Sequence, residues 1–180
     1  MIVCDTETTG LIEPMSLPLD RQPHIVEFAA IKLDDVTLEE VGRMEFLCKP
    51  PVQLTPEIMG ITNLTNEILA DKPPFAFYFE ELVEFFLGQR HFVAHNAAFD
   101  ASMIAFECRR LGLGGRFPWP RNHICTVEKS NHIDGFRLKL AQLHEKATGE
   151  NHINHAHRAM ADTEALVKGV RWLHAQGKLF

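Results

Sequence analysis

The order in which strand-like and helix-like segments follow one another is the feature that most constrains this fold. Residues 1–5 form a short apolar run, and Thr8-Thr9-Gly10 marks a turn after it. A second strand is predicted over residues 24–33, and a third over 36–48 after a turn at Asp34-Asp35. Three neighbouring strands with short links favour an antiparallel meander.

The second half of the sequence alternates helical periodicity with short strands. The predicted segments are helical turns over 55–70, a helix over 74–87, a strand over 91–94, a helix from 97 to about 111, a strand over 123–127, and helices over 138–148 and 157–176. Strands that alternate with helices imply parallel pairing. We therefore predict one α/β domain over residues 1–180, in which a three-strand antiparallel meander and two parallel strands form a mixed sheet flanked by helices.

The acidic charge balance excludes one class of nucleic-acid protein. A formal net charge of −6 argues against a large basic patch that holds long duplex, but not against an enzyme that grips a strand end through metal ions. No apolar stretch is long enough for a membrane helix, and the start lacks a signal-peptide pattern, so a cytoplasmic location is expected. The four cysteines lack the close spacing that is typical of zinc or redox motifs. They are expected to be reduced and buried: Cys4, Cys48, Cys108 and Cys125.

Asp5 and Glu7 stand two residues apart at the end of the first predicted strand. Because alternate residues of a strand point to the same side, the two carboxylates are expected side by side. Unneutralised, they repel each other, and one of them tends to take up a proton. A hard divalent cation such as Mg²⁺ or Mn²⁺ removes that repulsion. A solvated strand end before a turn is the alternative interpretation.

Asp100 lies in the first turns of a helix that Asn96 is expected to cap. An acid there complements the helix dipole, which is a purely structural role. However, an apolar stripe of Phe99, Met103 and Phe106 lies beside it. An acid at the margin of a core needs a partner, so Asp100 joins the candidate site residues.

His157 and Asp162 are five residues apart, a rotation of about 140° around a helix of 3.6 residues per turn. Two such residues in mid-helix would not share a face, but they can meet if His157 lies at or before the helix start. The polar segment 149–155 allows that arrangement. In the alternative interpretation, His152, His155 and His157 form a histidine-rich tract that binds zinc.

Four acids and one histidine thus lie at strand ends or helix starts, and a purely structural explanation does not account for the whole set. The chain resembles the DnaQ-like, or DEDDh, exonucleases in three motifs: Asp5-Thr-Glu7-Thr-Thr-Gly-Leu, His95-Asn96-Ala-Ala-Phe-Asp100 and His157-x-x-x-x-Asp162. That group includes proofreading subunits of replicative polymerases, ribonuclease T, oligoribonuclease and exonuclease X. The resemblance extends to Gly60-Ile61-Thr62 and Ile124-Cys125-Thr126, and so covers nearly the whole chain.

The resemblance implies a ribonuclease H-like fold and metal-dependent removal of single nucleotides from a 3′ end. Two divalent ions, Mg²⁺ or Mn²⁺, would be held by Asp5, which both share, by Glu7 and Asp162 at one position, and by Asp100 at the other. His157 would take the proton from the attacking water, because a histidine side chain exchanges protons near neutral pH. The sister DEDDy group carries a tyrosine four residues before the last Asp, where this chain has Arg158.

Substrate contacts follow from the same resemblance. The backbone of Thr8 lies where the family contacts the terminal 3′ hydroxyl, and apolar side chains pack against the last bases at Leu11, Ile61 and Phe99. Apolar contact tolerates any base, as a general exonuclease requires. Ile61 and Phe99 can equally be core residues. Glu27 lies in an apolar strand and needs a partner that the sequence does not identify.

Single-stranded or frayed DNA is the expected substrate, with two alternatives. An exoribonuclease of the oligoribonuclease or ribonuclease T type would differ in 2′-hydroxyl contacts, which the motifs do not encode. A non-catalytic module that holds a strand end would have a broken acid set, whereas this set is intact. The expected partner is a nucleic-acid 3′ end, met alone or within a DNA polymerase or another nucleic-acid-processing complex, and no membrane. The sequence does not specify the oligomeric state.

Overall fold

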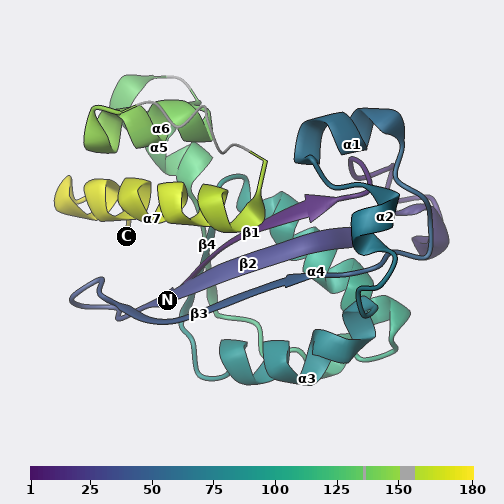
Figure 1. Cartoon of the computed structure of the whole chain (residues 1–180). Coiled ribbons are helices and arrows are strands. Elements are labelled where there is room, and N and C mark those ends of the chain that lie inside the picture. The colour runs from purple at the N-terminus through teal and green to yellow at the C-terminus, as the bar shows by residue number, and fades with distance from the viewer. Residues whose placement is uncertain (136, 151–156) are drawn as a thin grey trace.

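A five-stranded sheet forms the centre of the computed structural model, which describes residues 1–135, 137–150 and 157–180. The strands are β1 (Ile2–Thr8), β2 (Ile25–Leu33), β3 (Glu40–Leu47), β4 (His91–Ala94) and β5 (Asn122–Cys125). They are arranged in the order β3-β2-β1-β4-β5 (Figure 1). β1 pairs antiparallel with β2, and β2 with β3, whereas β1–β4 and β4–β5 are parallel. The predicted meander with two added parallel strands is confirmed.

Helices cover both faces of this sheet. They are α1 (Pro56–Thr62), α2 (Asn66–Leu69), α3 (Phe75–Phe86), α4 (Ala97–Arg110), α5 (Thr126–Asp134), α6 (Leu140–Thr148) and α7 (Ala159–Ala175). Figure 1 shows α5, α6 and α7 above the sheet, α3 below it, and α1 beside the end where β1 finishes. None of the helices in the described ranges is long and apolar enough to cross a membrane.

The alternation of side chains along β1 separates two hydrophobic cores. Ile2 and Cys4 face a cluster that includes Phe79 and Phe86 of α3, whereas Val3 faces the α6 and α7 side. The buried phenylalanines of α3, Phe75, Phe79 and Phe86, belong to the core, and each fully buried side chain of this kind contributes roughly 1.5–3 kcal/mol. The four cysteines are free; three are buried and one is partly buried.

Several boundaries differ from the prediction. β1 continues to Thr8, so the two acids lie within the strand and not after it. Residues 36–39 belong to a turn, because the Asp34 carboxylate accepts hydrogen bonds from the Val36 and Thr37 amides. β5 ends at Cys125, and α5 was not predicted; residues 126 and 127 are helical.

The two helix starts nearest the motifs also differ in detail. Asn96 occupies the N-cap position and α4 begins at Ala97, as predicted, but Asn96 is in the left-handed conformation (φ 78°) and its side chain makes no capping hydrogen bond. α7 begins at Ala159, two residues later than predicted, which leaves His157 ahead of the helix.

Candidate functional site

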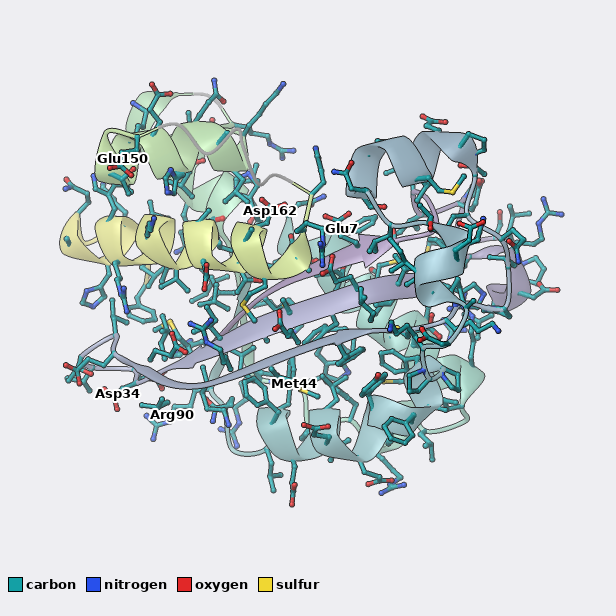
Figure 2. The ribbon with its side chains drawn as sticks, viewed as in Figure 1. Glu7, Asp34, Met44, Arg90, Glu150 and Asp162 are labelled. Carbon is teal, nitrogen blue, oxygen red and sulfur yellow. The ribbon has the colours of Figure 1, made fainter. Side chains whose placement is uncertain are left out.

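β1 delivers two acids to one side of the sheet. Asp5 and Glu7 are both partly buried, whereas Thr6 between them is buried and points to the opposite face. Figure 2 shows Glu7 and Asp162 next to each other between β1 and α7, far from Asp34 at the other end of the sheet. The predicted neighbourhood of the first and third motifs is therefore present.

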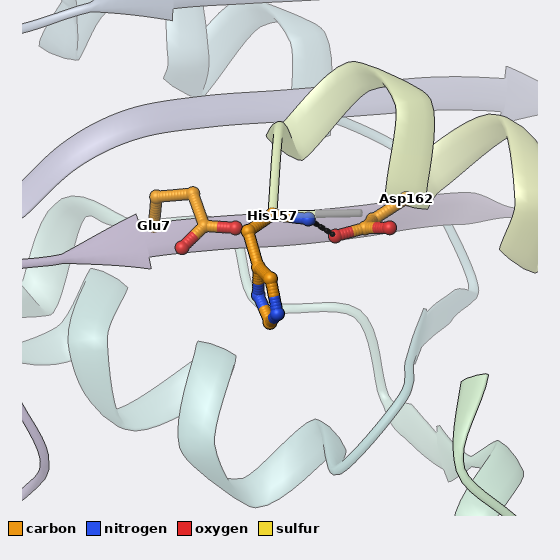
Figure 3. A group of neighbouring side chains, drawn as sticks. All are labelled: Glu7, His157 and Asp162. Atoms are coloured by element: carbon orange, nitrogen blue, oxygen red, sulfur yellow. Dashed lines mark hydrogen bonds between the residues drawn. The ribbon is translucent and has the colours of Figure 1, made fainter. Parts of the chain in front are cut away.

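His157 and Asp162 meet because the chain turns sharply before α7. His157 has a φ of 66°, a left-handed conformation that non-glycine residues adopt only where their surroundings hold them. Its backbone amide donates to Asp162 Oδ2 at 2.8 Å (Figure 3). Ligand atoms of Glu7, His157 and Asp162 all lie within 4.8 Å of one another. The arrangement that the five-residue spacing required is therefore observed.

Asp100 reaches the same region from α4. Its side chain is only 3% exposed, and its Oδ1 accepts a hydrogen bond from Thr6 Oγ1 at 2.8 Å. The charge of Asp100 contributes to the raised pKa of Asp5, so the two carboxyls are electrostatically linked. Four acids from three elements thus form one group, here called the acid cluster: Asp5, Glu7, Asp100 and Asp162.

Crowding of these acids changes their protonation. Burial, followed by the charges of Asp100 and Glu7, raises the pKa of Asp5 well above its usual range. Burial, followed by the charge of Asp162, raises the pKa of Glu7 to about 8. Burial also raises the pKa of Asp100 to about 7, although the hydrogen bond from Thr6 opposes this. Buried carboxyls whose main neighbours are other carboxyls hold protons near neutral pH until a cation replaces them.

The donor set of the acid cluster fits divalent cations. Carboxylate oxygens are the preferred ligands of Mg²⁺ and Mn²⁺, and mutual repulsion is what such ions relieve. His157 is exposed and stands beside two of the acids, within reach of a water molecule that they could help to hold. The catalytic and metal-binding roles of these five residues stay predictions.

A cation and an acid that the sequence could not pair adjoin this cluster. The Arg158 guanidinium binds both carboxylate oxygens of Glu27, with its Nη2 at 2.9 Å from Oε1. Glu27 was recognisable as an acid in an apolar strand, and Arg158 is the partner that it lacked. Nothing in the sequence links two residues that are 131 positions apart.

The predicted substrate residues lie in different environments. The side chains of Leu11 and Ile61 are 83% and 41% exposed, so neither belongs to the core. Phe99 is partly buried against the core, and Thr8 is buried, with its hydroxyl donating to the Gly10 carbonyl. The proposed zinc tract includes His152 and His155, which lie outside the described residues.

His95, in the second motif, is partly buried and contacts a side chain of α5. It lies just after β4, and its Nδ1 is 2.9 Å from Thr126 Oγ1 at the start of α5. Burial lowers the pKa of His95 to about 4, so this imidazole is neutral at physiological pH.

Comparison with known proteins shows which family the sequence matches. The sequence profile of the RNase T exonuclease family matches residues 2–169. The chain is 34% identical over 168 residues to "DNA polymerase III PolC-type" from Staphylococcus haemolyticus and to the same enzyme from Staphylococcus aureus. These alignments cover 91% of this chain and 10% of the polymerase. The chain thus spans about a tenth of the length of the curated relatives it matches.

Solved structures agree on the fold. Exonuclease X in complex with 5′ overhanging duplex DNA is 24% identical, with a TM-score of 0.68, and covers 99% of this chain and 96% of its own. The nuclease domain of 3′hExo, a DEDDh family member bound to rAMP, is 15% identical with a TM-score of 0.78 over 99% and 94% of the two chains. The solved structures confirm the expected ribonuclease H-like fold, and the family profile confirms the predicted exonuclease family.

Proposed function

We propose, from the premise that this chain belongs to the RNase T exonuclease family, that it removes single nucleotides from the 3′ end of single-stranded or frayed DNA. Two divalent ions, Mg²⁺ or Mn²⁺, are the proposed cofactors, and His157 is the proposed general base. The observation that carries this proposal is the meeting of Glu7, His157 and Asp162 beside the buried Asp100.

The residues of the site have separate proposed roles. Bound divalent ions supply positive charge that activates a water molecule and stabilises the oxygen that leaves phosphorus. Asp5, Glu7, Asp100 and Asp162 hold those ions. His157 accepts the proton of the attacking water as its oxygen bonds to phosphorus and the bond to the penultimate 3′ oxygen breaks. The products are a nucleoside 5′-monophosphate and a strand shortened by one nucleotide.

Exposed apolar side chains support a single-strand substrate. Leu11 and Ile61 present apolar surface to solvent, which suits contact with terminal bases of any identity. The Thr8 backbone is proposed to contact the 3′ hydroxyl, and Phe99 to pack against the terminal base. A duplex end must fray before it offers unpaired bases to such a surface.

The proposal of DNA as substrate is supported by the polymerase relatives. These relatives are named as DNA polymerases, and the matched region is about a tenth of their length. The proposed function is therefore exonuclease activity next to a DNA polymerase. An exoribonuclease is the alternative that the test below separates.

The deciding experiment is digestion of matched DNA and RNA oligomers labelled at the 5′ end, with Mg²⁺, with Mn²⁺ or with excess EDTA. We expect a ladder of shortening DNA products with either ion and none in EDTA. A 3′-phosphate should block the reaction, and Asp162→Asn is the inactive control. Activity in EDTA would contradict the metal mechanism, internal cuts would contradict an exonuclease, and faster digestion of RNA would establish the exoribonuclease alternative.

A further inference from the structure

Glu27 binds the chain on the C-terminal side of His157 at two successive residues. Its Oε1 accepts from Arg158 Nη2 at 2.9 Å, and both of its oxygens lie 3.1 Å from Arg158 Nε. Its Oε2 also accepts the backbone amide of Ala159, the first residue of α7, at 3.2 Å. Arg158, at the N-cap position, makes no side-chain capping hydrogen bond, so the carboxylate from β2 satisfies this helix terminus.

The position of Glu27 is unfavourable in every other respect. Its strand neighbours Val26 and Phe28 have no exposed surface, so a carboxylate there must be desolvated. Its partner across the β1–β2 pair is Glu7, and like charges directly opposite each other destabilise a sheet. The favourable interactions of this acid are therefore those with the α7 terminus.

These bonds restrain the backbone that carries the proposed base. His157 holds a left-handed conformation, which needs restraint from its surroundings. One restraint is the bond from its own amide to Asp162, a proposed metal ligand. A second restraint is the attachment of residues 158 and 159 to Glu27, which involves no proposed ligand.

We infer that Glu27 and Arg158 are positioning residues that set where the His157 imidazole stands relative to the acid cluster. This inference rests on the proposed role of His157 as the base. Arg158 is charged and 49% exposed, so a direct contact with a phosphate is the competing role, as is a purely electrostatic effect on the metal ions. The three roles predict different outcomes for variants that remove opposite charges.

The test compares Glu27→Gln, which is isosteric, with Arg158→Gln, which removes the guanidinium and shortens the side chain, and with the double variant. Each variant is checked to be fully folded at the assay temperature, because Arg158→Gln leaves the buried Glu27 without its cation and should lower the melting temperature. If the pair acts by electrostatics, Glu27→Gln removes a negative charge and Arg158→Gln removes a positive one, so the two variants should change metal affinity in opposite directions. If the pair positions His157, both single variants lower kcat by roughly 10–100-fold, as is typical of partners that orient a reacting group. KM and metal affinity then stay within about twofold, and the double variant resembles the single variants.

A second readout does not depend on activity. Ring-proton NMR signals of His157, assigned by their loss in His157→Ala, should shift or broaden in both single variants, and the Ala159 amide should exchange faster. The matched control is Arg116→Gln, which removes another bidentate ion pair, to Glu80 of α3 with both nitrogen–oxygen distances at 3.0 Å, and which involves no residue of α7. It should change neither readout.

Three results would overturn the inference. Unchanged His157 signals in both variants would show that the pair does not position the imidazole. Opposite changes in metal affinity with normal kcat would assign an electrostatic role. A rise in KM for Arg158→Gln alone would assign a phosphate contact. Failure of the proposed function can be told apart from failure of this inference, because the His157 signals can be measured even if the wild-type protein shows no exonuclease activity.

Discussion

Two clusters of charged side chains, each containing buried acid, lie at the end of the sheet where β1 finishes and β2 begins. In the acid cluster, the charged groups that act on Asp5 and Glu7 are mostly other carboxyls. In the second group, the Glu107 cluster, the carboxylate Oε1 lies 3.1 Å from His24 Nδ1, 3.1 Å from the Ile25 amide and 3.0 Å from Arg110 Nη1. The residue type and the burial are similar, but the surroundings are opposite.

The difference separates a structural acid from a functional one. Glu107 is already satisfied by donors from its own chain, and Arg110 extends the network to the carbonyls of Leu19, Gln22 and Pro23. The acid cluster holds more carboxyls than the adjoining Arg158 can balance, which is the setting in which the proposed cations would bind. Substitutions in the two clusters should therefore affect different quantities.

The largest expected effect is on activity, from Asp5→Asn. Turnover with Mg²⁺ should fall roughly 10³-fold or more, beyond the 10–100-fold typical of a residue that only orients a ligand. Relief of repulsion should leave the melting temperature of the metal-free protein unchanged or higher. Single-turnover rates and thermal melts in EDTA provide the measurements. A clear drop in melting temperature would place Asp5 with the structural acids.

Substitution of one histidine from each cluster gives the next largest effect. His157→Ala should lower turnover by about 10²–10⁴-fold, because it removes a general base, while metal affinity measured by calorimetry stays nearly intact. His24→Ala should instead lower stability and leave turnover within about twofold. If His157→Ala loses metal as severely as Asp5→Asn, then His157 is a ligand and the zinc interpretation returns.

Glu107→Gln tests the structural side of the comparison. The substitution leaves the partly buried Arg110 without an acid, which typically costs about 3 kcal/mol. At this chain length, that corresponds to a fall of about 6–12 °C in melting temperature. The rate of nucleotide release should change little. A matching loss of activity would show that the two clusters act as one network.

The smallest expected effect is the pH dependence of the metal-free protein. Glu7 and Asp100 have pKa values raised to about 8 and about 7 in the fold, above their usual values of 4.5 and 3.8. The folded state therefore binds more protons than the unfolded state between these limits, so stability falls as pH rises from about 4 to 8. We expect the melting temperature measured in EDTA to fall steadily as pH rises over this range. A flat profile would contradict the crowding of the acids, and Asp5→Asn should reduce the slope.

The sheet and the acid cluster could be predicted because local rules determine them. Alternation along a strand places Asp5 and Glu7 on one side, whatever the rest of the chain does. The five-residue spacing before Asp162 required a non-helical His157, and the structure has one. In each case, a period or a spacing carries the information.

The parts that could not be predicted depend on contacts between distant segments. The Glu27–Arg158 pair joins residues 131 positions apart, and Glu107 resembles an ordinary polar residue near the end of a helix. α5 was missed because its first residues, Thr-Val-Glu-Lys-Ser-Asn, are mostly polar and have no strong apolar period. Tertiary packing, not local preference, determines each of these features.

The left-handed backbone at His157 makes the proposed base replaceable by a small molecule. Glycine adopts such a φ without the steric cost of a Cβ atom, so His157→Gly should keep the turn before α7 while removing the imidazole. Because His157 is exposed, the vacated space is open to solutes. Free imidazole in the buffer should then restore turnover in proportion to its concentration. A base built into the chain would thereby become a reagent whose concentration and basicity the experimenter chooses.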